Sequence, residues 1–153
     1  MSDTASSEFE IDYSASPSSL EDIENSLRLP VLHGIVAAAI WLVVGSVLGL
    51  IASLQTYSPG LFADCSWLTH GKTKAVAWNV LLYGFALQLA IAMSLYIVCR
   101  LSHKSLRHPF TVFVAGKFWN LGVFLGVLGI FMGDASGHQF FGMPVYATAV
   151  LFL

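Results

Sequence analysis

The segment from Ala75 to Cys99 constrains the fold more than any other part of the chain. It contains no Asp, Glu, Lys or Arg, and it is flanked by Lys72 and Lys74 on one side and by Arg100 on the other. Since a helix rises about 1.5 Å per residue, the segment is long enough to cross a hydrocarbon layer of about 30 Å. Cations at both ends are typical of a helix anchored at the two headgroup layers. The segment therefore predicts a membrane-spanning helix.

Apolar segments recur along the rest of the chain. Of all residues, 56% are hydrophobic and only 10% are charged, whereas about a quarter of the residues in a soluble domain are charged. As a helix, the last apolar run would cover only about 13 Å, less than half a bilayer. We therefore expect part of a longer polypeptide. The sequence predicts an all-α membrane protein with three transmembrane helices and the start of a fourth, over residues 31–54, 75–99, 110–133 and 145–153.

The N-terminal segment differs in composition from this membrane domain. Residues 1–30 are rich in Ser and contain seven of the nine acidic residues but only one basic residue, Arg28. Low hydrophobicity with high net charge favours disorder, so we expect an acidic disordered tail over residues 1–30. The charge that precedes the first apolar run is negative, which argues against a secretory signal peptide.

A short amphipathic helix is predicted within this tail. Ser18 and Glu21 have the spacing of a helix capping box, and three large apolar residues that follow would share one helical face: Leu20, Ile23 and Leu27. We expect this helix to lie on the membrane surface and to end before Pro30, because proline disrupts a helix interior. The alternative is a disordered tail that is only locally helical.

The distribution of basic residues predicts the orientation of the chain. The connection between the second and third spans carries five basic or titratable residues, which would share one face if the helix continued through it: Arg100, His103, Lys104, Arg107 and His108. The positive-inside rule places this connection in the cytoplasm. We therefore predict a multi-pass protein of the cell inner (cytoplasmic) membrane whose N-terminus is cytoplasmic.

The sequence gives no indication of nucleic-acid binding, of a phosphate-binding loop, of a catalytic serine or of a disulfide bond. The chain has no basic patch suited to nucleic acid, no glycine-rich phosphate loop and no Gly-x-Ser-x-Gly motif. The two cysteines, Cys65 and Cys99, fall in a predicted loop and at a predicted helix end, so we expect no disulfide between them. The expected partners are the lipid bilayer and other membrane helices.

Small residues and a lysine stand out within the predicted spans. Two series of small residues have spacings that let helices approach closely: Gly34, Ala38, Gly45 and Gly49, and then Gly122, Gly126, Gly129 and Gly133. Lys117 lies about two turns inside the third span. It either extends toward the headgroups or serves a proton path, and we favour the first.

Among the histidines, His33 stands at the entrance to the first span. It is either a haem or metal ligand or a simple interfacial anchor, and we favour the anchor. His70 is expected in the loop before the second span, and a solvated loop histidine is the favoured interpretation.

Three motifs carry a resemblance to a known family. They are Trp67 to Lys74 (WLTHGKTK), Phe118 to Gly122 (FWNLG), and Gly133 to Gly137 (GDASG) shortly before Met143-Pro144. Together, over residues 31–153, they resemble the N-terminal part of subunit I of the cbb-type haem–copper cytochrome c oxidases. The resemblance implies a respiratory membrane subunit that passes electrons through a low-spin haem b to a haem–copper site. Such a subunit reduces dioxygen to water and pumps protons.

One position departs from the family pattern. Near the start of the second helix the family has His-Thr-Asn, whose histidine is an axial ligand of haem b, whereas this chain has Ala77-Trp78-Asn79. An alanine methyl group cannot ligate iron. His70 and His138 are the candidates to replace the ligand, and Gln139 stands where family members often have a glutamate. We predict no catalytic, cofactor-binding or metal-ligating residue in this chain.

These observations leave two principal hypotheses. The first is the N-terminal part of a divergent haem–copper oxidase subunit I that is not catalytic by itself and packs against other oxidase helices. The second is a non-catalytic membrane scaffold or assembly protein with oxidase-like helices. A small transporter component finds no support, because the spans contain no acidic residue.

Overall fold

The computed structural model describes residues 19–62, 64–138 and 142–152. The predicted disordered tail before Ser19 lies outside this range, as does Gln139. The described elements are all helical: α1 (Leu20–Tyr57), α2 (His70–Asn79), the π-helical segment η1 (Val80–Leu87), α3 (Gln88–Ser102), α4 (Pro109–Met132) and α5 (Val145–Phe152).

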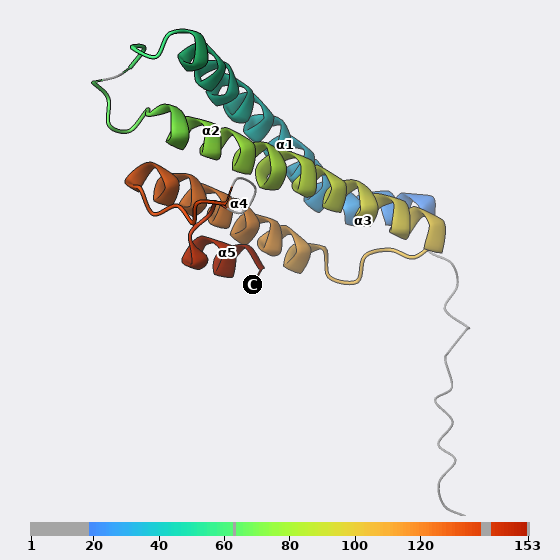
Figure 1. The fold of residues 1–153 in the computed structure, drawn as a ribbon. Helices are drawn as coiled ribbons and strands as arrows, with labels where there is room; N and C mark the ends of the chain where they lie inside the picture. The colour runs from blue at the N-terminus through green and yellow to red at the C-terminus, as the bar shows by residue number, and fades with distance from the viewer. Residues whose placement is uncertain (1–18, 63, 139–141, 153) are drawn as a thin grey trace, which may run out of the picture.

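The helices form an antiparallel bundle (Figure 1). The elements α2, η1 and α3 follow one another without a break, so the second rod runs from His70 to Ser102. It lies beside α1, while α4 packs against both, and α5 folds back along α4. The α1–α2 and α4–α5 loops lie at one end of the bundle, opposite the α3–α4 connection (Figure 1).

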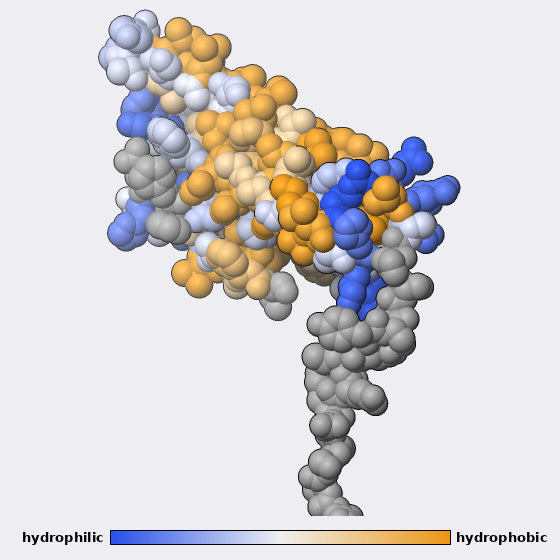
Figure 2. Space-filling model, turned by 90° about the vertical axis from the view of Figure 1, so that its right-hand side faces the viewer, coloured by the Kyte–Doolittle hydropathy of each residue, from blue (hydrophilic) through white to orange (hydrophobic). Residues whose placement is uncertain are grey.

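Three rods are long and apolar enough to cross a membrane, namely Leu20–Tyr57, His70–Ser102 and Pro109–Met132. Hydrophobic residues cover the middle of the molecule, and hydrophilic residues gather toward its two ends (Figure 2). On α1 the exposed apolar side chains recur at helical spacing: Leu32, Val36, Ile40, Val43, Val47, Leu50 and Leu54. Such a continuous apolar face suits lipid rather than water. The predicted all-α membrane fold is confirmed.

The first helix does not end before Pro30, contrary to the prediction. Helix α1 begins at Leu20, with the Ser19 side chain accepting a hydrogen bond from the Asp22 amide, and it continues through Pro30. A proline inside a helix costs about 3 kcal/mol. Tertiary packing offsets that cost here, because Ile23 and Leu27 are buried against Cys99 of α3. The amphipathic segment therefore faces the bundle rather than lying flat on the membrane.

An ion pair holds the same end of the bundle. Arg100 donates to Glu24 at 2.8 Å, and both side chains are exposed. Exposed pairs contribute about 0–1 kcal/mol, so this contact adds little to the stability of the bundle.

The basic connection after α3 does not continue as a helix. Helix α3 ends at Ser102, and His103 adopts the left-handed conformation with φ 50°. The Leu106 amide then donates to the Ser26 hydroxyl at 3.1 Å, and Pro109 begins α4, where its missing N–H costs nothing. The predicted common helical face of the basic residues is therefore wrong, although they still cluster at one end of the molecule.

Three of the four predicted glycines form a packing surface on α4, whereas Gly133 follows the helix as its C-cap, with φ 95°. A Cβ atom on Gly122 would lie 2.9 Å from the Leu151 backbone, and one on Gly126 would lie 2.8 Å from the Met143 sulfur. On Gly129 it would collide with Pro144 and with the Tyr146 hydroxyl. Helix α5 and the residues before it can therefore approach α4 only because these side chains are absent.

The small residues of α1 behave in the same way, with one exception. A Cβ atom on Gly34 would lie 2.8 Å from Ala92 of α3, and one on Gly45 would lie 2.8 Å from Leu81 of η1. A Cβ atom on Gly49 would meet nothing within 4 Å. Gly49 borders a cavity instead of a helix.

Lys72 of α2 joins the α1–α2 loop to the C-terminal end of α4 and provides a test of the packing. Its ammonium group donates to the Phe131 carbonyl at 2.9 Å and to the Ser66 carbonyl at 3.2 Å. A cation is favourable at the carbonyl end of α4. We expect Lys72→Met to lower the free energy of unfolding by about 1 kcal/mol. Lys74→Met is the control in detergent unfolding titrations, and equal losses in both variants would contradict the assignment.

Candidate functional site

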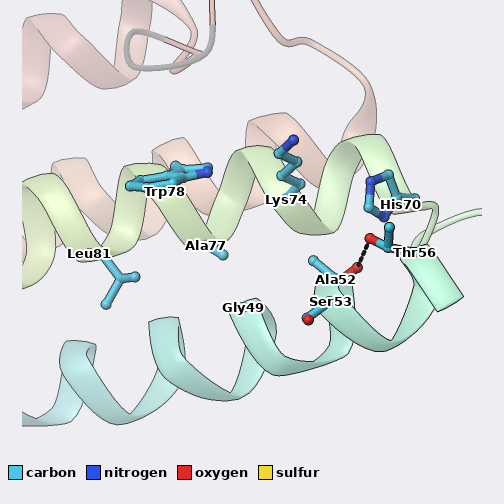
Figure 3. A pocket seen from close by; sticks show the side chains of 9 residues that line it. All are labelled: Gly49, Ala52, Ser53, Thr56, His70, Lys74, Ala77, Trp78 and Leu81. Atoms are coloured by element: carbon cyan, nitrogen blue, oxygen red, sulfur yellow. Dashed lines mark hydrogen bonds between the residues drawn. The ribbon is translucent and has the colours of Figure 1, made fainter.

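Ala77, the residue at which the chain departs from the family that it resembles, borders a cavity between α1 and α2. Ala77 is buried, with 4% of its surface exposed. It shares one face of the second rod with four other residues that border this cavity: His70, Lys74, Trp78 and Leu81. The cavity has a volume of about 270 Å³ (Figure 3).

The opposite wall of the cavity consists of small residues on α1. Gly49, Ala52 and Ser53 leave room where larger side chains would fill the space between the helices. The Thr56 hydroxyl donates to the Ala52 carbonyl at 3.1 Å, within its own helix (Figure 3). The cavity exists because these small residues of α1 face Ala77 across the α1–α2 contact.

The residues around Ala77 do not fit a low-spin haem. The methyl group of Ala77 offers no lone pair, and no other nitrogen ligand replaces it at that height of the helix. His70 is the nearest histidine on this face, but it lies two turns, or about 10 Å, farther along the axis. The cavity volume of 270 Å³ is also below the range of about 300–1,000 Å³ that is usual for drug-sized ligands.

The two candidate replacement histidines lie in different places. His70 is the first residue of α2, not a loop residue as expected, and it is exposed. His138 lies in the loop between α4 and α5 and borders a second cavity of about 310 Å³. Lys74 and Trp78 border both cavities, but neither cavity contains both histidines. The structure therefore does not bring them together as a ligand pair.

The other singled-out side chains lie in the opposite half of the bundle. His33 packs against Phe113, with ring centroids 4.9 Å apart. Lys117 is exposed, and its ammonium group lies 5.2 Å from the same aromatic ring, one turn toward the start of α4. This direction is that of a lysine extending toward the headgroups. In the described part of the chain, no group of three His, Cys, Asp or Glu side chains has metal-site geometry.

Both cysteines are free, as expected. Cys65 is partly buried in the α1–α2 loop, and Cys99 is buried near the end of α3. The structure thus agrees with the absence of a disulfide inferred from the sequence.

Two tryptophan hydrogen bonds connect the helices near the centre of the bundle. The Trp41 indole donates to the Asn120 side-chain oxygen at 2.7 Å, and the Trp119 indole donates to the Tyr83 carbonyl at 3.0 Å. Tyr83 belongs to the π-helical segment η1, where a widened turn offsets the carbonyls from regular helical bonding. Sequence reasoning missed this polar layer. Its only signal was the Trp-Asn pair within the FWNLG motif.

The Trp41–Asn120 bond predicts a measurable coupling. We expect Trp41→Phe to reduce stability by about 1 kcal/mol, because the Asn120 oxygen loses its donor within the bundle. A double-mutant cycle with Asn120→Ala, measured by unfolding in mixed micelles, isolates this contribution. Fully additive losses would show that the two side chains are not coupled.

Comparison with known proteins supports the oxidase resemblance at a coarse level. The chain is similar to a cytochrome c oxidase subunit 1 homolog from Azorhizobium caulinodans, with 24% identity over 131 residues. The match covers 86% of this chain but 24% of that protein, so the chain spans about a quarter of the relative's length. No family model matches the sequence, and no solved structure matches it. The cbb type remains a prediction.

Proposed function

We propose that the chain is the N-terminal part of a divergent haem–copper oxidase subunit I of the cbb type, and that it contributes helices rather than a haem ligand. The observation that carries this proposal is the similarity to the cytochrome c oxidase subunit 1 homolog along most of the chain. Three apolar rods of spanning length support a place in a multi-pass membrane complex. The exposed apolar faces of α1 and α4 would then meet lipid or further oxidase helices.

We propose a structural role because the second rod lacks the haem-ligating residue of the family. Ala77 stands where the family has its haem-ligating histidine, and the residues around it do not fit the group. What the chain supplies is packing. The glycines of α4 allow α5 to pack closely against it. Hydrogen bonds from the Trp41 and Trp119 indoles connect α4 with α1 and η1. Electron transfer and dioxygen reduction would belong to the complete complex.

A comparison of two preparations tests this proposal. We expect the chain purified alone from a haem-replete host to show no low-spin b band. Isolated from its native membrane in mild detergent, the chain should co-purify with haem b and with azide-sensitive dioxygen consumption. A native preparation without haem or dioxygen consumption would overturn the oxidase role.

The second candidate is a non-catalytic membrane scaffold or assembly protein with oxidase-like helices. The replacement of the family histidine by Ala77 favours it, because a scaffold does not need the ligand. It predicts co-purification with oxidase subunits during assembly but not with the finished, oxygen-consuming complex. Pulse–chase isolation at successive times separates the two roles.

A further inference from the structure

An open groove lies beside α1, at the end of the bundle that holds the Arg100–Glu24 ion pair. It has a volume of about 550 Å³. Seven of its lining residues belong to α1, between Glu24 and Ile35, and the eighth is Tyr96 of α3. None of them borders the cavity beside Ala77. The groove is therefore separate from the candidate functional site.

The lining of this groove changes from polar to apolar along α1. Glu24, Asn25 and Arg28 line its first part, whereas Leu32 and Ile35 line the part farther along the helix. Between residues 24 and 35 the helix rises about 16 Å. Leu32 and Ile35 are 57% and 38% exposed, so their side chains are accessible to an occupant. A phospholipid changes from polar headgroup to apolar chain in the same order.

The polar part of the groove lies at the level expected for the headgroups. The apolar run that is predicted to cross the membrane begins at residue 31, and Arg28 comes about one turn before it. On the neighbouring rod, Arg100 directly follows the uncharged segment that ends at Cys99. Cations at the ends of spanning helices mark the headgroup layer. The groove therefore leads from the headgroup layer into the hydrocarbon.

Arg28 gives the polar part a net positive charge. The other charged residue of the lining, Glu24, is already paired with Arg100 at 2.8 Å. Arg100 also lies over the Tyr96 ring, 5.8 Å from its centroid. Arg28 is exposed and forms no ion pair with any described residue. An exposed guanidinium group without a carboxylate partner favours an anion, and its planar donors match the oxygens of a phosphate group.

We propose that this groove binds an anionic phospholipid. Its phosphate group would accept hydrogen bonds from the Arg28 guanidinium, and the Asn25 amide would donate to the same headgroup. One acyl chain would lie along Leu32 and Ile35, beside the Tyr96 ring. The groove would bind this lipid whether or not the bundle belongs to an oxidase.

Charge and polarity together distinguish this occupant from its competitors. A zwitterionic phospholipid brings its own cation close to Arg28 and therefore gains less from the arginine. An apolar helix would cover Leu32 and Ile35 but would take the Arg28 charge out of water without a partner, which is costly. A free phosphate ion would reach Arg28 but would leave the apolar part of the groove uncovered.

Native mass spectrometry of the full chain, released from micelles of an uncharged detergent, tests the proposal. The probes are dioleoyl phosphatidylglycerol and dioleoyl phosphatidylcholine at equal concentrations, which share their acyl chains and differ in net charge. We expect the chain to retain the anionic lipid about fivefold more than the zwitterionic one, as one cation at a membrane surface allows. Inorganic phosphate should not displace the lipid. Equal retention of the two lipids, or displacement by inorganic phosphate, would overturn the proposal.

Two arginine variants locate the binding. Arg28→Gln should remove the preference for phosphatidylglycerol, and the fold should tolerate it because the side chain is exposed. Arg107→Gln is the matched control, since it removes the same charge from the connection after α3, outside the groove lining, and it should keep the preference. Equal losses in both variants would mean a general attraction of anionic lipid to this end of the bundle. Lipid-free dimers in place of lipid-bound monomers would assign the groove to a second copy of the chain. Either result would contradict the proposal.

Discussion

Alanine at Gly129 is expected to destabilise the bundle, whereas alanine at Gly49 is expected to leave it unchanged or slightly more stable. The added Cβ atom at Gly129 collides with the Pro144 ring and the Tyr146 hydroxyl, whereas at Gly49 it meets nothing within 4 Å. Overpacking of this kind costs about 1–3 kcal/mol. At an open helical position, replacing glycine by alanine contributes up to about 1 kcal/mol in favour of the helix.

The same substitution should therefore lower the stability of the bundle at Gly129 but not at Gly49. Unfolding titrations in mixed micelles, followed by tryptophan fluorescence, measure both variants against the parent chain. Tyr146→Phe in the Gly129→Ala background should recover part of the loss, because it removes one of the colliding atoms. Equal effects at Gly129 and Gly49 would contradict the close approach of α5 to α4.

Arginine at Leu121 is expected to block insertion of α4 into the membrane. Leu121 lies near the centre of Pro109–Met132, and its side chain is 45% exposed on the apolar outer surface. An arginine at the centre of a spanning helix costs about 2.5–3.5 kcal/mol on insertion scales. Lys117, one turn away, already carries a positive charge, so the two charges also repel one another.

The control is the same residue at a different depth. Met132 is the last residue of α4 and is 74% exposed, so an arginine there can reach the headgroups. We expect Met132→Arg to insert normally and Leu121→Arg to lose most of its inserted fraction, as measured by glycosylation mapping of engineered acceptor sites. Equal insertion of the two variants would mean that the middle of α4 does not lie in hydrocarbon.

The fold was largely predictable because the physical signal was strong. A long uncharged apolar segment favours a helix in lipid, because a helix satisfies its own backbone hydrogen bonds there. The glycine spacing of α4 indicated where another helix packs. The continuity of α1 through Pro30 was not predictable, since it depends on burial of Ile23 and Leu27 against α3. Local rules for proline describe a helix alone and not the tertiary contacts that keep it intact.

The candidate sites were less predictable than the fold. The motif comparison identified Ala77 as the departure from the family, and the structure added the cavity beside it. A cavity lined by His33 and Gln88 could not be predicted, because residues of α1, α3 and α4 form it only in the folded bundle. For the Trp41–Asn120 bond, whose partners are separated by 79 residues, the only signal was the Trp-Asn pair within the FWNLG motif.

The measurement that tests the account most directly is a detergent-phase partitioning experiment combined with a visible spectrum. The chain would be purified alone from membranes of a haem-replete host, without partner subunits. We predict that it enters the detergent phase and shows no low-spin haem b bands in the reduced-minus-oxidised spectrum. Recovery in the aqueous phase would contradict the membrane bundle, and haem b bands from the chain alone would contradict the structural role assigned to its second helix.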